Sequence, residues 1–265
     1  MRIDEVFEQT HKLPTVPRVV QELISSFGQE DINVSEIADR IALDQVITAK
    51  LLRLANSAHF GASRKIGSAH EAIIVLGFNT VRTLVVASGV TGAFVATPGF
   101  DRQQFWRKGL HVALAARGIA QRSRDNREIA FTCGLLHSIG ELLIHVVEPE
   151  LAAKIDRSVA TGSDRIKLES SNLGFTYLEL GAELARRWNF PETIQQAIAE
   201  QQDAAPSSRL SALLQLALAA TAAEGGDAPV WPTAALELLQ LPAAELDALL
   251  PTLELHDPEL EEMLL

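Results

Sequence analysis

The sequence predicts an all-α fold, and three observations lead to this prediction. Apolar residues recur three and four residues apart in most segments, the spacing that places them on one face of a helix. Residues that cap helices precede several of these segments. Segments in which apolar and polar residues alternate, as in strands, are short throughout the chain. We therefore expect a globular multi-helix bundle.

The helices of the first hundred residues are bounded by clear signals. Pro17 suits a first helical turn and Gly28 a helix end. Asn33 and Asp44 are expected N-caps, and Ser68 forms an S-x-x-E capping pattern with the glutamate three residues later. The expected helices are 17–27, 33–42, 45–56, 68–77 and an almost entirely apolar helix from residue 79 to the Pro98-Gly99 break.

The rest of the chain continues the helical pattern. Thr176 and Glu179 form a second capping pattern, and a loop rich in glycine and proline spans residues 225–232. We expect one domain over residues 1–223, with an N-terminal subregion at about 10–97 and a second at about 100–223, followed by an extension over 224–265. The expected helices are 102–122, 126–147, 149–160, 176–188, 192–202, 208–223, 234–240 and 243–250.

Composition excludes several classes of protein. Apolar residues make up 47% of the chain and charged residues 22%, which is ordinary for a globular protein and excludes disorder. The start of the chain is acidic, unlike a secretion signal. Glycines and a proline interrupt the uncharged stretch 83–100, so we expect a buried helix there, because a membrane span needs about 20 apolar residues. The single cysteine, Cys133, is expected to be a buried thiol of a cytoplasmic protein.

The net charge of −11 is unevenly distributed. Residues 1–209 carry 23 basic and 24 acidic side chains, whereas residues 210–265 carry ten acidic side chains and none that is basic. The acidic end argues against nucleic acid or an anionic membrane as its partner. It is either a surface for a basic partner or a solvated segment whose deletion, over residues 252–265, leaves the fold intact.

Several short segments carry a family resemblance. They are Leu13-Pro14-Thr15-Val16-Pro17, residues 44–54 followed by Ala55-Asn56-Ser57, residues 72–77, Phe105-Trp106 and Leu135-Leu136-His137. Over residues 10–220 the chain resembles an HDOD domain, a relative of the metal-dependent HD and HD-GYP phosphohydrolases. The resemblance implies an all-α fold in a bacterial signalling or regulatory protein.

The resemblance also implies where an HD-type site would lie. HD phosphohydrolases hold one or two divalent metals with histidines and an aspartate from separate helices, and the metal activates a water molecule. Carried over to this sequence, His111 matches the first histidine and His137 the second. Ser138 stands in place of the paired aspartate, and Glu141 in place of an expected lysine.

Downstream positions that carry histidines in the superfamily hold Tyr177, Gln201 and Gln202. The resemblance therefore implies a vestigial site, with no catalytic residue and no cofactor. The main hypothesis is a non-enzymatic regulatory domain that acts by binding a partner protein.

An enzyme remains the alternative. His137, Glu141 and His145 follow one another at four-residue intervals, so a continuous helix would present all three on one face. With His111 they would form the ligand set of a weakly bound divalent metal in a divergent phosphohydrolase acting on a cyclic dinucleotide or another phosphodiester. The competing interpretation has His137 hydrogen-bonded in the interior and the other two side chains in solvent.

A third hypothesis is nucleic-acid binding through residues 33–65. Two short helices there could be mistaken for a helix-turn-helix, and Lys50, Arg53, Arg64 and Lys65 lie nearby. The absence of net positive charge in this half of the chain argues against it. Partner identity and oligomeric state are not predicted by the sequence.

Overall fold

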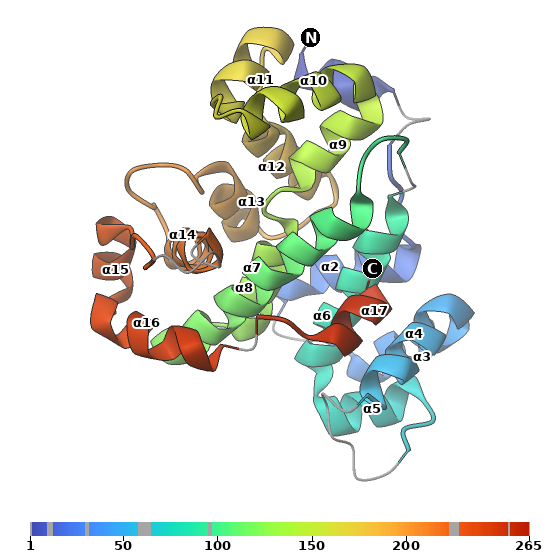
Figure 1. Ribbon diagram of the computed structural model, residues 1–265. Helices are drawn as coiled ribbons and strands as arrows, with labels where there is room; N and C mark the ends of the chain where they lie inside the picture. The colour runs from blue at the N-terminus through green and yellow to red at the C-terminus, as the bar shows by residue number, and fades with distance from the viewer. Residues whose placement is uncertain are drawn as a thin grey trace.

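The structure, a computed structural model, describes residues 2–9, 13–29, 32–57, 65–94, 97–222, 228–253 and 255–264. Within these ranges the regular structure is helical and contains no strand, which confirms the all-α prediction. In Figure 1 the helices α7 (Arg102–Ser123) and α8 (Arg127–Leu136) lie at the centre, with α9–α12 at one end and α3–α5 at the other. Residues 225–227 of the loop expected over 225–232, and Arg64, lie outside the described residues.

The predicted caps of the N-terminal helices are confirmed. The Asn33 side chain accepts a hydrogen bond from the Glu36 amide, Asp44 accepts from two amides, and Ser68 accepts from the Glu71 amide. A short first helix was not expected. The elements are α1 (Ile3–Glu8), α2 (Arg18–Ser25), a 3₁₀ turn (Ser26–Gly28), α3 (Val34–Leu43), α4 (Gln45–Ala55), α5 (Ala69–Leu76) and α6 (Phe78–Ala93).

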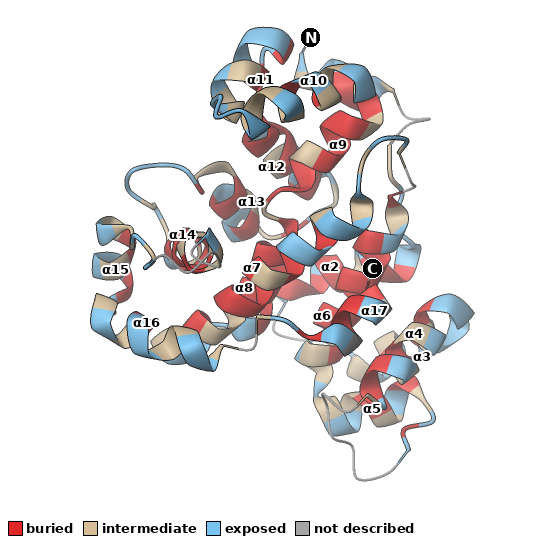
Figure 2. Cartoon of the chain, viewed as in Figure 1, coloured by how far each residue is buried: buried red, intermediate tan, exposed pale blue. Residues whose placement is uncertain are grey.

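The second group of helices packs around α7 and α8. Figure 2 shows that the surfaces of α8 and α14 are largely buried there. Trp106 on α7 is 1% exposed and packs edge-on against Phe94, as expected of a core anchor. The elements are α7 (Arg102–Ser123), α8 (Arg127–Leu136), α9 (Ile139–Val147), α10 (Pro149–Ala160), α11 (Arg165–Leu173), α12 (Tyr177–Arg187), α13 (Glu192–Ala199) and α14 (Arg209–Ala222).

The prediction of a single helix over residues 126–147 is wrong, because the structure has two helices there, α8 and α9. The chain leaves helical geometry at Ser138, whose φ of −110° and ψ of 14° separate α8 from α9. By length and composition Arg127–Val147 is apolar enough to cross a membrane, but 78% of its most apolar window is buried inside the protein. Cys133, in the same segment, is fully buried as expected, and burial raises the pKa of its thiol to about 12.

The position of α9 after the break depends on Gly140. A Cβ atom at Gly140 would lie 1.9 Å from the carbonyl oxygen of Tyr177, at the start of α12, and 2.8 Å from the amide nitrogen of Gly181. The backbones of α9 and α12 therefore touch without intervening side chains. This contact fixes the direction in which the chain leaves α8.

The acidic C-terminal segment packs on the domain. Leu260 and Leu264 are 1% and 2% exposed, and α17 contacts α4 and α6. Glu262 forms an ion pair with Arg53 on α4. The interpretation of residues 252–265 as a solvated segment is therefore wrong for α17. The subregion boundaries proposed from the sequence stay a prediction. The elements are α15 (Thr233–Leu239), α16 (Ala243–Leu249), a 3₁₀ turn (Leu250–Thr252) and α17 (Pro258–Leu264).

Gly140→Ala is expected to lower the free energy of unfolding by about 3 kcal/mol or more, because the added methyl group would overlap backbone atoms that cannot move independently. The matched control is Gly92→Ala in α6, where the nearest atom to the new Cβ is the flexible Lys50 Nζ at 3.9 Å. Its stability should stay the same or rise by up to about 1 kcal/mol. Urea denaturation measures both, and equal values would contradict the close α9–α12 contact.

Leu260→Ala is expected to lower the free energy of unfolding by about 2 kcal/mol or more, since it leaves a cavity under α17. Val230→Ala, at a side chain that is 89% exposed, should change it by less than about 0.5 kcal/mol. Deleting residues 252–265 should reduce the yield of soluble protein further. A truncated chain with wild-type stability in thermal denaturation would show that the tail adds nothing to the fold.

Candidate functional site

A cavity of about 360 Å³ opens beside the break between α8 and α9. His137 and Ser138 from the break and Glu141 and His145 from α9 line it, so four residues singled out in the sequence share one cavity. The remaining lining comes from α7, α10, α11 and the segment before α7. These residues are Gly99, Phe100, Asp101, Gln104, Phe105, Lys108, Asp156 and Arg165.

His137 is held as a neutral imidazole. Its Nδ1 lies 2.7 Å from the Gly134 carbonyl oxygen, so Nδ1 carries the proton and donates it to that carbonyl. Burial lowers the pKa of His137 to about 4, and this hydrogen bond, which raises the pKa, does not offset the effect. At neutral pH the Nε2 atom is therefore the basic nitrogen of the ring.

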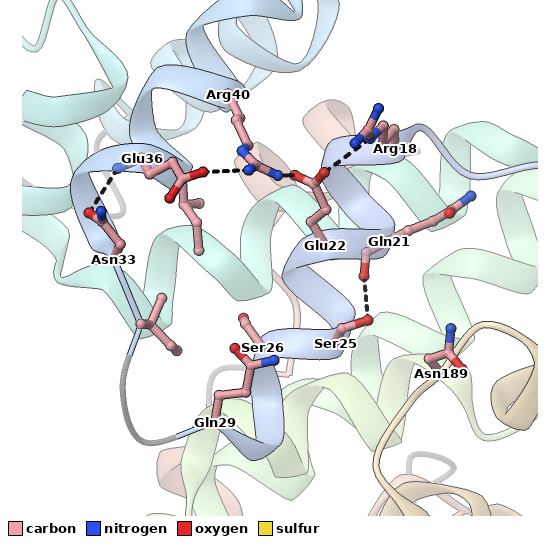
Figure 3. Close-up of a pocket in the computed structure, with 12 residues that line it drawn as sticks. Arg18, Gln21, Glu22, Ser25, Ser26, Gln29, Asn33, Glu36, Arg40 and Asn189 are labelled. Atoms are coloured by element: carbon pink, nitrogen blue, oxygen red, sulfur yellow. Dashed lines mark hydrogen bonds and ion pairs between the residues drawn. The ribbon is translucent and has the colours of Figure 1, made fainter.

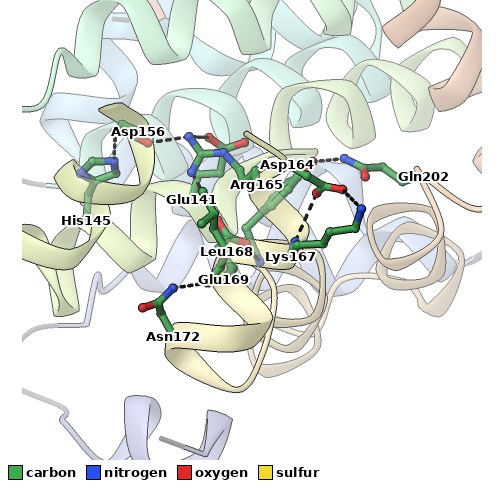
Figure 4. Close-up of polar contacts among 11 residues, drawn as sticks. Glu141, His145, Asp156, Asp164, Arg165, Lys167, Leu168, Glu169, Asn172 and Gln202 are labelled. Atoms are coloured by element: carbon green, nitrogen blue, oxygen red, sulfur yellow. Dashed lines mark hydrogen bonds and ion pairs between the residues drawn. The ribbon is translucent and has the colours of Figure 1, made fainter. Parts of the chain in front are cut away.

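Arg165 connects three carboxylates (Figure 4). Its guanidinium lies 2.5 Å from Asp156 on α10, 3.3 Å from Glu169 on α11 and 3.6 Å from Glu141 on α9. Burial raises the pKa values of Glu141 and Glu169, and the charge of Arg165 opposes this shift. The guanidinium thus neutralises much of the negative charge that a metal ion would otherwise need.

His145 belongs to the same cluster (Figure 4). Its Nε2 lies 2.8 Å from Asp156 Oδ2, and its ring stacks at a tilt on Phe100 with 4.1 Å between centroids. Burial raises the pKa of Asp156, but hydrogen bonds from His145 and Arg165 outweigh burial and leave it lowered. The interpretation that His145 faces solvent is wrong, because the residue is only 4% exposed.

The glutamines at the downstream positions make structural hydrogen bonds. The Gln201 side chain donates to the carbonyl oxygens of His137, at 2.7 Å, and of Ile198, at 2.8 Å. Gln202 donates to the Tyr177 hydroxyl at 3.0 Å. The Tyr177 backbone amide in turn donates to the Glu169 carboxylate at 2.6 Å. Tyr177 therefore links Gln202 to Glu169, one of the carboxylates that contact Arg165.

The structure separates His111 from the cavity. On α7 it is Gln104, Phe105 and Lys108 that line the cavity, while the His111 Nε2 lies 3.6 Å from Glu261 on α17. Among the described residues, the only group of three or more potential ligands with ligand atoms within 4.8 Å of one another is His111, His256 and Glu261. The set His111, His137, Glu141 and His145 therefore does not converge as expected.

Sequence reasoning missed Lys108, Asp156, Arg165 and Glu169. The last two lie on α11, a helix that was not expected, although Asp164 caps it by accepting a hydrogen bond from the Lys167 amide. This aspartate was the available signal. The contacts of Arg165 join three helices and have no counterpart in local sequence spacing.

An HD-type metal does not fit the residues present. Such a metal needs several carboxylate and imidazole ligands directed at one point. Here Arg165 forms ion pairs with the carboxylates of Asp156 and Glu169. Lys108 adds a second cation to the lining, and Ser138 offers only a hydroxyl. The cavity can hold a small polar molecule, with Lys108 and Arg165 as cationic contacts.

A second cavity, of about 440 Å³, lies between α2 and α3 (Figure 3). Its charged groups pair with one another: Glu22 contacts Arg18 at 3.1 Å and Arg40 at 2.6 Å, and Arg40 also contacts Glu36. Arg53, one of the cations of the nucleic-acid hypothesis, pairs with Glu262. Of the described cations in residues 33–65, Arg40 and Arg53 are therefore already paired with carboxylates.

His137 predicts a specific pH dependence. The unfolded chain protonates this residue below about pH 6.5, whereas the folded protein keeps it neutral until about pH 4, so its contribution destabilises the fold as the pH falls between these values. The stability difference between wild type and His137→Gln should shrink by up to about 3 kcal/mol from pH 7 to pH 4. Urea denaturation across this range measures it, and a constant difference would contradict the neutral imidazole.

Residues 13–204 match the family model of the HDOD domain. A 194-residue segment is 28% identical to an uncharacterized protein of Treponema pallidum, in an alignment that covers 71% of this chain and 37% of that protein. The chain thus spans little more than a third of the length of this curated relative.

Two crystal structures resemble the whole chain. A candidate phosphohydrolase of Shewanella amazonensis is 33% identical, with a TM-score of 0.82 and 98% of each chain covered. An HDOD domain protein of unknown function from Geobacter sulfurreducens is 25% identical, with a TM-score of 0.74, and the match covers 99% of this chain and 92% of that one. The family match extends over more than half of the chain and agrees with the all-α bundle, and this chain belongs to the HDOD domain family.

Proposed function

We propose that this chain is a non-enzymatic regulatory HDOD domain that acts by binding a partner protein. One observation carries the non-enzymatic part of the proposal. Arg165 pairs with three carboxylates at the cavity lined by His137 and Ser138, which keeps these carboxylates from holding a metal ion. A partly buried guanidinium that pairs with three carboxylates is costly to displace, because its removal leaves like charges facing one another.

The rest of the cavity supports the proposal. His137 supplies one basic nitrogen, but its neighbour Ser138 supplies no charge to anchor a hard cation. Gln201 holds the His137 backbone in place, so the break that shapes the cavity is retained without metal ligands. These features favour a cavity kept for structure or for ligand binding over one kept for hydrolysis.

The proposal does not commit to a basic partner. Several acidic residues of the C-terminal segment are engaged within the chain. Glu245 pairs with Arg122, Asp247 accepts from the Trp231 indole, Glu261 pairs with Arg107, and Glu262 pairs with Arg53. At least four of the acidic side chains of this segment therefore contribute to its contacts within the chain.

A divergent metal-dependent phosphohydrolase is the second candidate. His137, Glu141, His145 and Asp156 line one cavity, and the Shewanella protein with 33% identity is described as a candidate phosphohydrolase. In this case a metal would have to displace Arg165 from Glu141 and Asp156. Its binding would then depend on His137.

A hydrolysis assay separates the two candidates. Purified wild type and His137→Gln are incubated with Mg²⁺, Mn²⁺ or Zn²⁺ and either bis(p-nitrophenyl) phosphate or a cyclic dinucleotide. We expect equal product formation by the two proteins, at the level of metal alone, because Arg165 blocks the ligand positions. Metal-dependent hydrolysis that His137→Gln abolishes would overturn the proposal and establish the enzyme.

A further inference from the structure

A group of metal-ligating side chains lies outside the cavity described above. His111 comes from the middle of α7, His256 from the segment before α17, and Glu261 from α17 itself. One ligand atom from each residue lies within 4.8 Å of the other two. None of the three lines the cavity at the α8–α9 break.

The two imidazoles address the same carboxylate oxygen. Glu261 Oε1 lies 2.6 Å from His256 Nδ1 and 3.6 Å from His111 Nε2. The two rings are nearly perpendicular, at 84°, with 6.2 Å between their centroids. Two ring nitrogens and one carboxylate oxygen, from three different segments, therefore lie within a few ångströms of one another.

The carboxylate is already oriented and charged. Arg107 Nε donates to Glu261 Oε2 at 2.9 Å, which leaves Oε1 directed toward the histidines. Burial raises the pKa of Glu261, but hydrogen bonds from Arg107 and His256 outweigh burial and leave it lowered. A hydrogen-bonded outer residue that fixes the orientation of a ligand is a common feature of metal sites.

We propose that His111, His256 and Glu261 bind a divalent transition-metal ion. Two imidazoles and one carboxylate suit Zn²⁺, and also Co²⁺ or Ni²⁺, better than Mg²⁺ or Ca²⁺. Zinc bonds of about 2.0–2.1 Å require ligand atoms roughly 3.3 Å apart, so the ion would replace the proton between His256 and Glu261 and move them slightly apart. The His256 side chain is 62% exposed, so it has room to move away from Glu261 by this small distance.

The ion would connect α17 to α7. Without it, α17 is held by its contacts with α4 and α6, by the Arg107–Glu261 pair to α7, and by the exposed Arg53–Glu262 pair, which contributes little. A bound ion adds a direct link between the C-terminal segment and the centre of the fold. Metal occupancy thus sets how firmly α17 covers α4 and α6.

The site is tested with full-length protein carrying no histidine tag, stripped of metal with a chelator that is then removed. Isothermal titration with ZnCl₂ should show one ion per chain for wild type. His256→Ala, at an exposed side chain, should bind at least about 10-fold more weakly. The matched control is His70→Ala, since His70 is also an exposed histidine beside a carboxylate, Asp39, and should bind like wild type.

His137→Gln separates this site from the cavity of the proposed function and should also bind zinc like wild type. As a second measurement, zinc should slow amide hydrogen exchange in residues 258–264 of wild type and His70→Ala, but not of His256→Ala. Equal zinc affinity in wild type and His256→Ala, loss of binding in His137→Gln, or no binding by wild type would each overturn the proposed site.

Discussion

The arrangement of the helices around the cavity depends on one partly buried guanidinium. Arg165 contacts carboxylates from α9, α10 and α11, and through them it positions other groups: Asp156 also holds His145, and Glu169 also accepts the amide at the start of α12. Three carboxylates this close would repel one another without a shared cation. The positions of four helices are therefore coupled through a single side chain.

The sequence predicted the fold class and most helices, because the signals involved are local. A cap such as Asn33 or Asp44 acts within its own first turn, so four residues suffice to recognise it. The break at Ser138 was missed because the segment is apolar on both sides of it. The position of α9 after the break involves the contact of Gly140 with Tyr177, some forty residues further along the chain. Local periodicity carries no information about such a contact.

The candidate site was predicted in part, for the same physical reason. His137, Glu141 and His145, which their spacing placed on one face of a helix, do line one cavity, although the helix is broken at Ser138. His111 was placed in the wrong environment because most faces of α7 are buried, so apolar neighbours do not reveal which face a given residue occupies. Lys108, one turn earlier, lines the cavity together with Gln104 and Phe105 of the same helix. The cluster around Arg165 requires knowing that α10 and α11 fold back onto α9.

The backbone contact between α9 and α12 has a consequence for how the cavity could change during evolution. Because Gly140 packs against the Tyr177 carbonyl, α9 cannot move closer to α12. The part of the cavity wall that α9 forms is therefore rigid. The opposite wall, from α7, α10 and α11, is built of long side chains such as Lys108 and Arg165. New ligand preferences in relatives of this protein would then arise by exchanging those side chains on a constant frame, without any rearrangement of helices.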